Sequence, residues 1–216
     1  MISHVFKKAE QANIGEVIVA TEDQEIVDDV KKNGGQVILT KKQHKTGTDR
    51  IYEALENLDT TNIDLVMNLQ GDEPLMNIED IRDLNNQMIK NQSQLGTLAS
   101  EIRDEATYKN ENIVKAMTKE KLDGFNFPEV ISFMRKVSKD YKNVYHHLGI
   151  YCYQKDTLKN FVSFNQSENE LNNKLEQLRA LDNNININVS LAKSSPIGVD
   201  TKEDFLAIKK IMEYKS

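Results

Sequence analysis

The stretch Asn-Leu-Gln-Gly-Asp-Glu-Pro at residues 68–74 decides the fold that the sequence favours. It closes an apolar run over 64–69 that is typical of a buried strand. In open parallel sheets, ligands bind in the crevice at the carboxyl ends of the strands. Asp72 and Glu73 directly follow such an end, where two carboxylates could hold a hard cation such as Mg2+. As a bare acidic turn, the same residues would simply face solvent.

Strand-like and helix-like segments alternate on both sides of this stretch. Further strands are predicted at 16–21, 36–40, 95–102 and 185–192, and helices at 2–12, 25–33, 51–58, 78–91, 171–181 and 201–214. This alternation predicts an α/β protein with a Rossmann-like, mainly parallel sheet that helices cover on both faces. Strand-like runs at 112–118, 125–133 and 145–153 predict an antiparallel extension, about 112–154, within a single domain spanning 1–216.

Composition excludes several classes of function. The 216 residues carry a formal net charge of -6, which argues against non-specific binding to nucleic acid or to an anionic membrane. The single cysteine, Cys152, cannot form an internal disulfide, so a reducing cytoplasm is the expected compartment. Because Cys152 lies in an apolar run, we expect a buried thiol rather than a nucleophile. No stretch is long and apolar enough to span a bilayer.

Three further segments carry polar groups that could serve a site. The run His-Lys-Thr-Gly-Thr at 44–48 opens a helix, whose first N–H groups favour anions, although Thr46 could be an ordinary cap. His146 and His147 precede an apolar run and, as strand neighbours, would point to opposite faces. The segment Gly-Val-Asp-Thr at 198–201 could cap the last helix or supply a second acid. Glu176 and Arg179, on the predicted helix at 171–181, would most simply face solvent.

Seven strings in this order resemble one family along essentially the whole chain. They are Val-Ile-Val-Ala-Thr-Glu-Asp, Gly-Gly-Gln-Val, His-Lys-Thr-Gly-Thr-Asp-Arg, Asn-Leu-Gln-Gly-Asp-Glu-Pro, His-Leu-Gly-Ile-Tyr, Leu-Glu-Gln-Leu-Arg and Gly-Val-Asp-Thr, beginning at residues 17, 34, 44, 68, 147, 175 and 198. The chain resembles the 3-deoxy-manno-octulosonate (Kdo) cytidylyltransferases, which have a nucleotide-diphospho-sugar transferase fold. The resemblance implies transfer of CMP from CTP to Kdo, with release of pyrophosphate, for lipopolysaccharide assembly.

The resemblance also implies site residues, a metal and an assembly. Asp72 and Asp200 would hold Mg2+ and form the catalytic centre. Nucleotide contacts would come from His44, Thr46, Gly47, Thr48 and Gln70, and sugar contacts from His147, Glu176, Gln177 and Arg135. The family further implies a homodimer, with which the apolar run at 145–153 is compatible.

The chain departs from the family pattern at its start. The family begins with a strand and an Arg/Lys-containing loop that cradles the triphosphate, and Met1 matches a position shortly after that loop. The absent strand would lie between the strands at 16–21 and 64–69, so each would lack a ladder partner. We therefore expect an N-terminally shortened form. The alternatives are a cytidylyltransferase for another acidic sugar, such as a nonulosonate, and a non-catalytic remnant.

Overall fold

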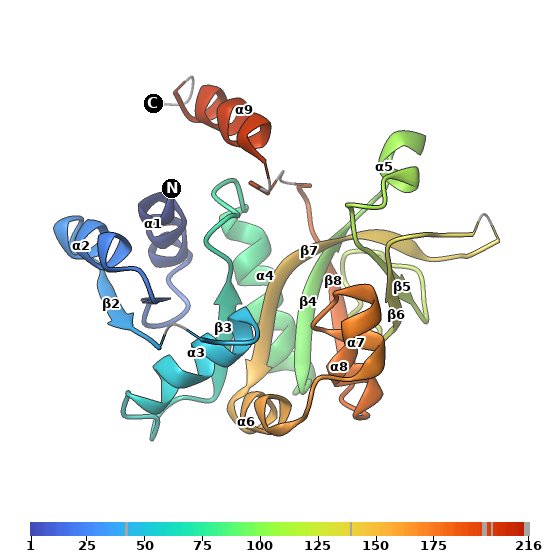
Figure 1. Ribbon diagram of the computed structural model, residues 1–216. Coiled ribbons are helices and arrows are strands. Elements are labelled where there is room, and N and C mark those ends of the chain that lie inside the picture. The colour runs from blue at the N-terminus through green and yellow to red at the C-terminus, as the bar shows by residue number, and fades with distance from the viewer. Residues whose placement is uncertain (42, 139, 196–197, 200, 214–216) are drawn as a thin grey trace.

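The computed structural model describes residues 1–41, 43–138, 140–195, 198–199 and 201–213 (Figure 1). Helices and strands alternate through the first half of the chain, as predicted. The elements are α1 (Ile2–Ala12), β1 (Ile18–Thr21), α2 (Gln24–Lys32), β2 (Gln36–Leu39), α3 (Gly47–Glu56), β3 (Leu65–Leu69), α4 (Ile78–Asn91), β4 (Leu95–Ser100), α5 (Glu105–Lys109), β5 (Lys115–Thr118), β6 (Val130–Met134), β7 (Val144–Gln154), α6 (Lys155–Ser163), α7 (Glu168–Asn173), α8 (Leu178–Asp182), β8 (Ile187–Leu191) and α9 (Lys202–Glu213).

A six-stranded sheet forms the centre of the molecule, in the order β6-β5-β7-β4-β8, with β3 also paired to β7. Strand β7 is antiparallel to β3, β4 and β5, whereas β4 and β8 are parallel. Consequently β3, β4, β5 and β8 share one direction, and β7 and β6 run against them. The predicted α/β class with an antiparallel extension is confirmed. The run at 145–153 lies in β7, an inner strand whose two edges are paired within this chain.

Strands β1 and β2 form a separate, parallel two-stranded sheet. Within the described residues no ladder joins β1 to β3, although residues from both strands line one cavity of about 1450 Å3. The walls of this cavity also include apolar side chains of α1 and α3, such as Phe6 and Leu55. The expectation that these two strands lack a ladder partner on their facing sides is therefore confirmed for the described chain.

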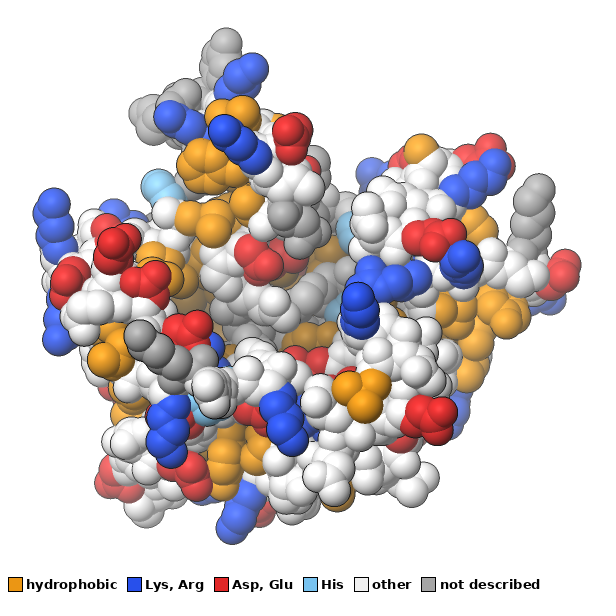
Figure 2. Space-filling model, in the orientation of Figure 1, with side chains coloured by type: hydrophobic (Ala, Val, Ile, Leu, Met, Phe, Trp, Pro, Cys, Tyr) orange, Lys and Arg blue, Asp and Glu red, His pale blue; other side chains and the backbone are white. Residues whose placement is uncertain are grey.

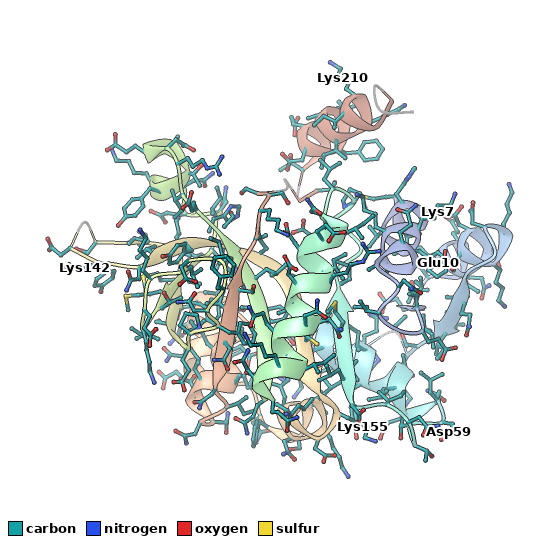
Figure 3. All side chains as sticks on the ribbon, turned by 180° about the vertical axis from the view of Figure 1, so that it is seen from behind. Lys7, Glu10, Asp59, Lys142, Lys155 and Lys210 are labelled. Carbon is teal, nitrogen blue, oxygen red and sulfur yellow. The ribbon has the colours of Figure 1, made fainter. Side chains whose placement is uncertain are left out.

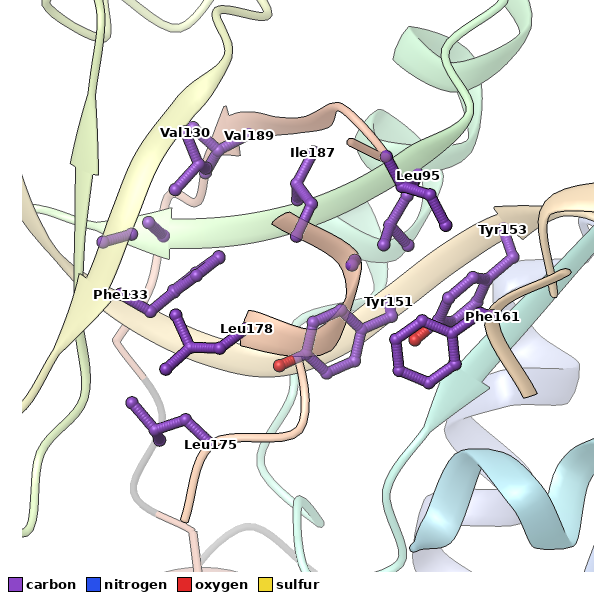
Figure 4. Close-up of a cluster of buried hydrophobic side chains, with 14 of the residues drawn as sticks. Leu95, Val130, Phe133, Tyr151, Tyr153, Phe161, Leu175, Leu178, Ile187 and Val189 are labelled. Carbon is purple, nitrogen blue, oxygen red and sulfur yellow. The ribbon is translucent and has the colours of Figure 1, made fainter. Parts of the chain in front are cut away.

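Two apolar clusters cover the two faces of the six-stranded sheet. On one face, Ile81, Leu84 and Met88 of α4 pack against alternate β7 residues, including the fully buried Cys152. On the other, aromatic side chains of β7 and α6 meet Leu175 and Leu178, as Figure 4 shows. Burial raises the pKa of the Cys152 thiol to about 12, which fits the predicted structural cysteine.

The predicted helix at 171–181 is wrong in one respect, because it is two short helices with a break between them. Lys174 ends α7 with a left-handed backbone (φ 52°), and α8 begins only at Leu178. Apolar spacing continues across the break because Leu175 and Leu178 still face the same core. Helices α5 and α6 were not predicted from the sequence: α5 has only five residues, and α6 follows β7 directly, without an intervening turn signal.

Charged side chains project from the outer surfaces of the molecule. Figure 3 shows Lys7 and Glu10 on the outside of α1 and Lys210 on α9, far from Asp59 and Lys155. Among the described residues, no helix has the length and apolar character needed to cross a membrane.

Candidate active site

A cavity of about 1460 Å3 lies at the sheet edge where β3, β4 and β8 end and the first half of β7 passes. Its walls combine acids, histidines and cations: Asp72, Glu73, Glu101, Arg103, Arg135, His146, His147, Lys174 and Lys193. Figure 2 shows acidic, histidine and cationic side chains around the hollow between α9 and α5. The carboxyl ends of the strands therefore meet at a polar site, as the position of the acidic turn predicts.

The acidic turn after β3 is held by its own backbone and by the segment after β8. The N–H of Glu73 donates to the carbonyl of Gln70 at 3.2 Å, which closes the turn. The N–H of Val199 donates to the carbonyl of Asp72 at 2.9 Å. A Cβ atom added to Gly198 would lie 3.3 Å from Glu73 Oε1, so the two segments are closely packed. The two acidic motifs of the sequence thus meet, although Asp200 itself lies outside the described residues.

The donors present fit a hard cation that retains water and binds substrate oxygens. Asp72 lines the cavity and is half-buried. In the part of the chain that the structure describes, no three His, Cys, Asp or Glu side chains cluster as a complete metal cage. Mg2+ does not require such a cage, because it is usually held by one or two carboxylates together with phosphates and water.

The start of α3 is the predicted nucleotide side of the site. The Thr46 side chain accepts from the N–H of Asp49, and Asp49 in turn accepts from the N–H of Thr46, which forms a capping box. Gly47 borders the cavity between β1 and β3, whereas Gln70 lines both cavities. The predicted ligand His44 is turned toward α3, with Nε2 2.5 Å from Glu53 Oε2.

Glu176 lies in the break between α7 and α8 and not on a solvent-facing helix, contrary to expectation. Its carboxyl group interacts with the hydroxyls of Thr48 and Thr46, and its Oε1 is buried with no hydrogen-bond partner among the described residues. Burial raises the pKa of Glu176, against the opposing influence of the two threonines and Arg179. Glu176 thus joins the segment predicted to contact sugar to the segment predicted to contact nucleotide.

Arg179 is also buried rather than solvent-facing, with 1% of its side chain exposed. It donates to both carboxylate oxygens of Glu170, at 2.8 and 2.5 Å, and lies 3.7 Å from Asp49. Its guanidinium group also stacks over Phe161, 4.6 Å from the ring centre. This pairing holds α8 in place, and Gln177, the residue before α8, is buried at the wall of the cavity. From its charge alone, Arg179 was expected to face solvent, because the sequence does not show that Glu170 is its partner.

His147 is buried at the cavity wall, between Phe133 and Tyr151. Its Nε2 lies 3.0 Å from the hydroxyl of Thr97, which also donates to the carbonyl of Ile150 at 2.7 Å. Burial, and secondarily the nearby His146, lowers the pKa of His147 to about 3, so the ring is neutral at physiological pH. Sequence reasoning missed Thr97, because nothing distinguishes a site threonine from any other threonine in an apolar strand.

Arg135 lines the same cavity, but its guanidinium group also holds the surrounding loops. It donates to the carbonyls of Asn112, Glu111 and Asn173 at 3.2, 3.3 and 3.4 Å. Directly beside it, the buried Lys115 donates from Nζ to the carbonyl of Arg135 at 2.9 Å, and burial lowers its pKa. The predicted contact of Arg135 with a sugar carboxylate remains a prediction.

Comparisons with known proteins agree with the resemblance drawn from the motifs. The family model described as cytidylyltransferase matches residues 1–187. The 3-deoxy-manno-octulosonate cytidylyltransferase of Bartonella tribocorum is 37% identical over 98% of this chain and 87% of its own length. That of Rhodopseudomonas palustris (strain BisB5) is 38% identical over 99% of this chain and 87% of its own length.

Solved structures give the same result at the level of the fold. The structure of CMP:2-keto-3-deoxy-manno-octonic acid synthetase complexed with CTP is 29% identical and covers 100% of this chain and 88% of that chain, with a TM-score of 0.88. A UDP-glucose pyrophosphorylase complexed with UDP-glucose is 14% identical, covers 100% of this chain and 87% of that one with a TM-score of 0.71, and shares the fold alone. The chain therefore belongs to the cytidylyltransferase family, among the 3-deoxy-manno-octulosonate cytidylyltransferases.

Proposed function

We propose that this protein transfers CMP from CTP to Kdo, giving CMP-Kdo and pyrophosphate for lipopolysaccharide biosynthesis. The observation that carries the proposal is the relationship to Kdo cytidylyltransferases along 98% of the chain. It is supported by one cavity that Asp72 and Gln70 line together with His147, Gln177 and Arg135. A nucleotidyltransferase needs positioning and charge neutralisation more than covalent chemistry. A cavity edged by both acids and cations meets that need.

In this reaction the anomeric hydroxyl oxygen of Kdo attacks the α-phosphorus of CTP. The bond from that phosphorus to the bridging oxygen breaks, pyrophosphate leaves, and the hydroxyl proton is released. The nucleotide would be held by Thr46, Gly47, Thr48 and Gln70, with His44 nearby. His147, Glu176 and Gln177 would hold the sugar acid, and Arg135 its carboxylate.

Asp72 and Asp200 would hold Mg2+ in this site. When bound, the ion would neutralise phosphate charge and help to align the sugar acid with the α-phosphate. The hydrogen bond from Val199 to the Asp72 carbonyl supports this assignment, because it brings the second acidic motif to the first.

The test is to incubate the purified chain with CTP, Mg2+ and Kdo and to measure pyrophosphate and CMP-Kdo together. The proposal expects the two products in equal amounts, and neither without Mg2+. A parallel reaction with a nonulosonate tests the alternative sugar. Product from the nonulosonate alone would contradict the choice of Kdo, and a silent calorimetric titration with CTP and Mg2+ would instead indicate a non-catalytic remnant.

We also propose that the protein is a cytoplasmic homodimer. The exposed apolar side chains Phe205 and Leu206 of α9 are a candidate surface for the contact. Light scattering of the purified chain tests the dimer, and a monomer mass at micromolar concentration would contradict it.

A further inference from the structure

The bulge between β4 and β7 has a chemical consequence at the site wall. The register shifts between Thr97, which faces Tyr151, and Leu98, which faces Leu148, so Gly149 and Ile150 have no partner on β4. Bulges of this kind re-aim groups next to active sites. Here the Thr97 hydroxyl donates to the carbonyl oxygen of Ile150 at 2.7 Å. This side-chain hydrogen bond replaces the backbone pairing that Ile150 lacks with β4.

The single hydroxyl proton of Thr97 determines where the proton of His147 must lie. A carbonyl can only accept a hydrogen bond, so the short contact to Ile150 uses the Thr97 proton. The same hydroxyl oxygen lies 3.0 Å from Nε2 of His147 and has only a lone pair left to offer. Nε2 must therefore carry the ring proton. Since a neutral imidazole has one N–H, the other nitrogen, Nδ1, is an acceptor.

We propose that Thr97 is a positioning residue that fixes His147 as the Nε2–H tautomer, so that Nδ1 accepts a hydrogen bond from a hydroxyl of the sugar acid. A lone pair repels a carboxylate, so His147 would select the hydroxylated part of the substrate and leave the carboxylate to the cations of the cavity wall, such as Arg135. Among the described residues, no protein group bonds to Nδ1. This inference rests on the proposed function for the identity of the ligand.

Phe133 and Tyr151 support the assignment by restricting how the ring can turn. The Phe133 ring meets the imidazole of His147 edge-on, with ring centres 4.9 Å apart. The Tyr151 ring contacts the same imidazole at a tilt, with ring centres 5.5 Å apart. His146, the neighbouring histidine, instead has its Nδ1 3.0 Å from Ser195 Oγ on the segment after β8. The two adjacent histidines therefore differ in partner, and only His147 has its ring proton dictated by a threonine that is already donating.

The first test measures the tautomer without any substrate. Long-range proton–nitrogen NMR on 15N-histidine-labelled protein distinguishes protonated from unprotonated ring nitrogens, and His147→Gln identifies the resonances. We expect the wild type and Thr97→Ser to show only the Nε2–H form, and Thr97→Val to show a mixture. Thr157→Val, a buried threonine on α6, is the matched control and should leave His147 unchanged. An Nδ1–H tautomer in the wild type would overturn the proposal.

The second test is steady-state kinetics with CTP and Kdo. Thr97→Val should raise KM for the sugar acid about tenfold, the loss expected for one oriented hydrogen bond, with KM for CTP unchanged. Thr97→Ser keeps the hydroxyl and should therefore show the wild-type KM for the sugar acid. Equal effects on both KM values would refute a role toward the sugar. If the wild type does not turn over Kdo at all, the proposed function fails, whereas the NMR result still decides whether Thr97 sets the tautomer.

Discussion

Replacing Glu170 with Gln should destabilise the protein by about 3 kcal/mol, because it leaves the Arg179 charge buried without a full partner. The side chains of Glu170 and Arg179 are 4% and 1% exposed and share two hydrogen bonds. Glutamine can keep one of these as an acceptor, and Asp49, 3.7 Å away, offers only partial compensation. We therefore take the lower end of the range of about 3–5 kcal/mol for breaking a buried pair.

Urea denaturation at pH 7 measures this loss, and the melting temperature should fall by about 6–12 °C for a chain of this length. The matched control is Glu105→Gln, which removes an exposed pair with Lys109 and should cost less than about 0.5 kcal/mol. A loss below about 1 kcal/mol for Glu170→Gln would refute the argument from buried charge.

The pH dependence gives an independent check of the same pair. Burial alone would raise the pKa of Glu170, but hydrogen bonds from Arg179 and Gln166 outweigh it and hold the pKa below its usual value. The ionised carboxylate therefore contributes stability above its unfolded pKa, and that contribution is lost as pH falls through its folded pKa. The difference between wild type and Glu170→Gln should shrink on acidification. A constant difference from pH 7 to pH 3 would contradict the assignment.

Four shorter predictions concern the site and the core. Glu176→Gln should raise the free energy of unfolding at pH 7, because the folded protein favours the neutral acid. The gain should vanish below the unfolded pKa of Glu176, and turnover should fall in the same variant. Thr46→Ala should cost about 1 kcal/mol in denaturation through loss of its cap, and should raise KM for CTP. Asp72→Asn should lower kcat/KM on the order of 100-fold, measured by steady-state kinetics with CTP and Kdo. Cys152 should react with a thiol reagent only after unfolding, since it is fully buried.

The sequence was informative wherever local pattern and tertiary packing agree. Apolar periodicity placed the helix at 78–91, and the acidic turn was correctly placed at the carboxyl end of a strand. It was least informative where a distant partner decides the outcome. Glu176 and Arg179 have helical spacing and charge, so they suggested a solvated face. Only the fold brings Glu170 and the threonines of the α3 start to them.

Pairing between strands was also beyond the sequence pattern. A continuous apolar run such as 145–153 indicates a buried strand, but it does not indicate which strands pair with it. In the structure it is inner, because β3 and β5 pair with one side of β7 and β4 with the other. The bulge at Gly149 and Ile150 follows from that pairing, and the role of Thr97 follows from the bulge. No single-residue pattern could have revealed it.

The contacts of Glu176 and Arg179 explain how two separate sheets can serve one site. No ladder among the described residues connects β1 to β3, so backbone pairing does not place the start of α3 against the six-stranded sheet. Side chains do so instead: Thr48 lies 3.5 Å from the hydroxyl of Tyr153, and Asp49 lies beside Arg179. Glu176 adds a third contact through the threonine hydroxyls. Because nucleotide-side and sugar-side residues are joined by these buried polar contacts, substitutions in them should change the alignment of the two substrates as well as stability.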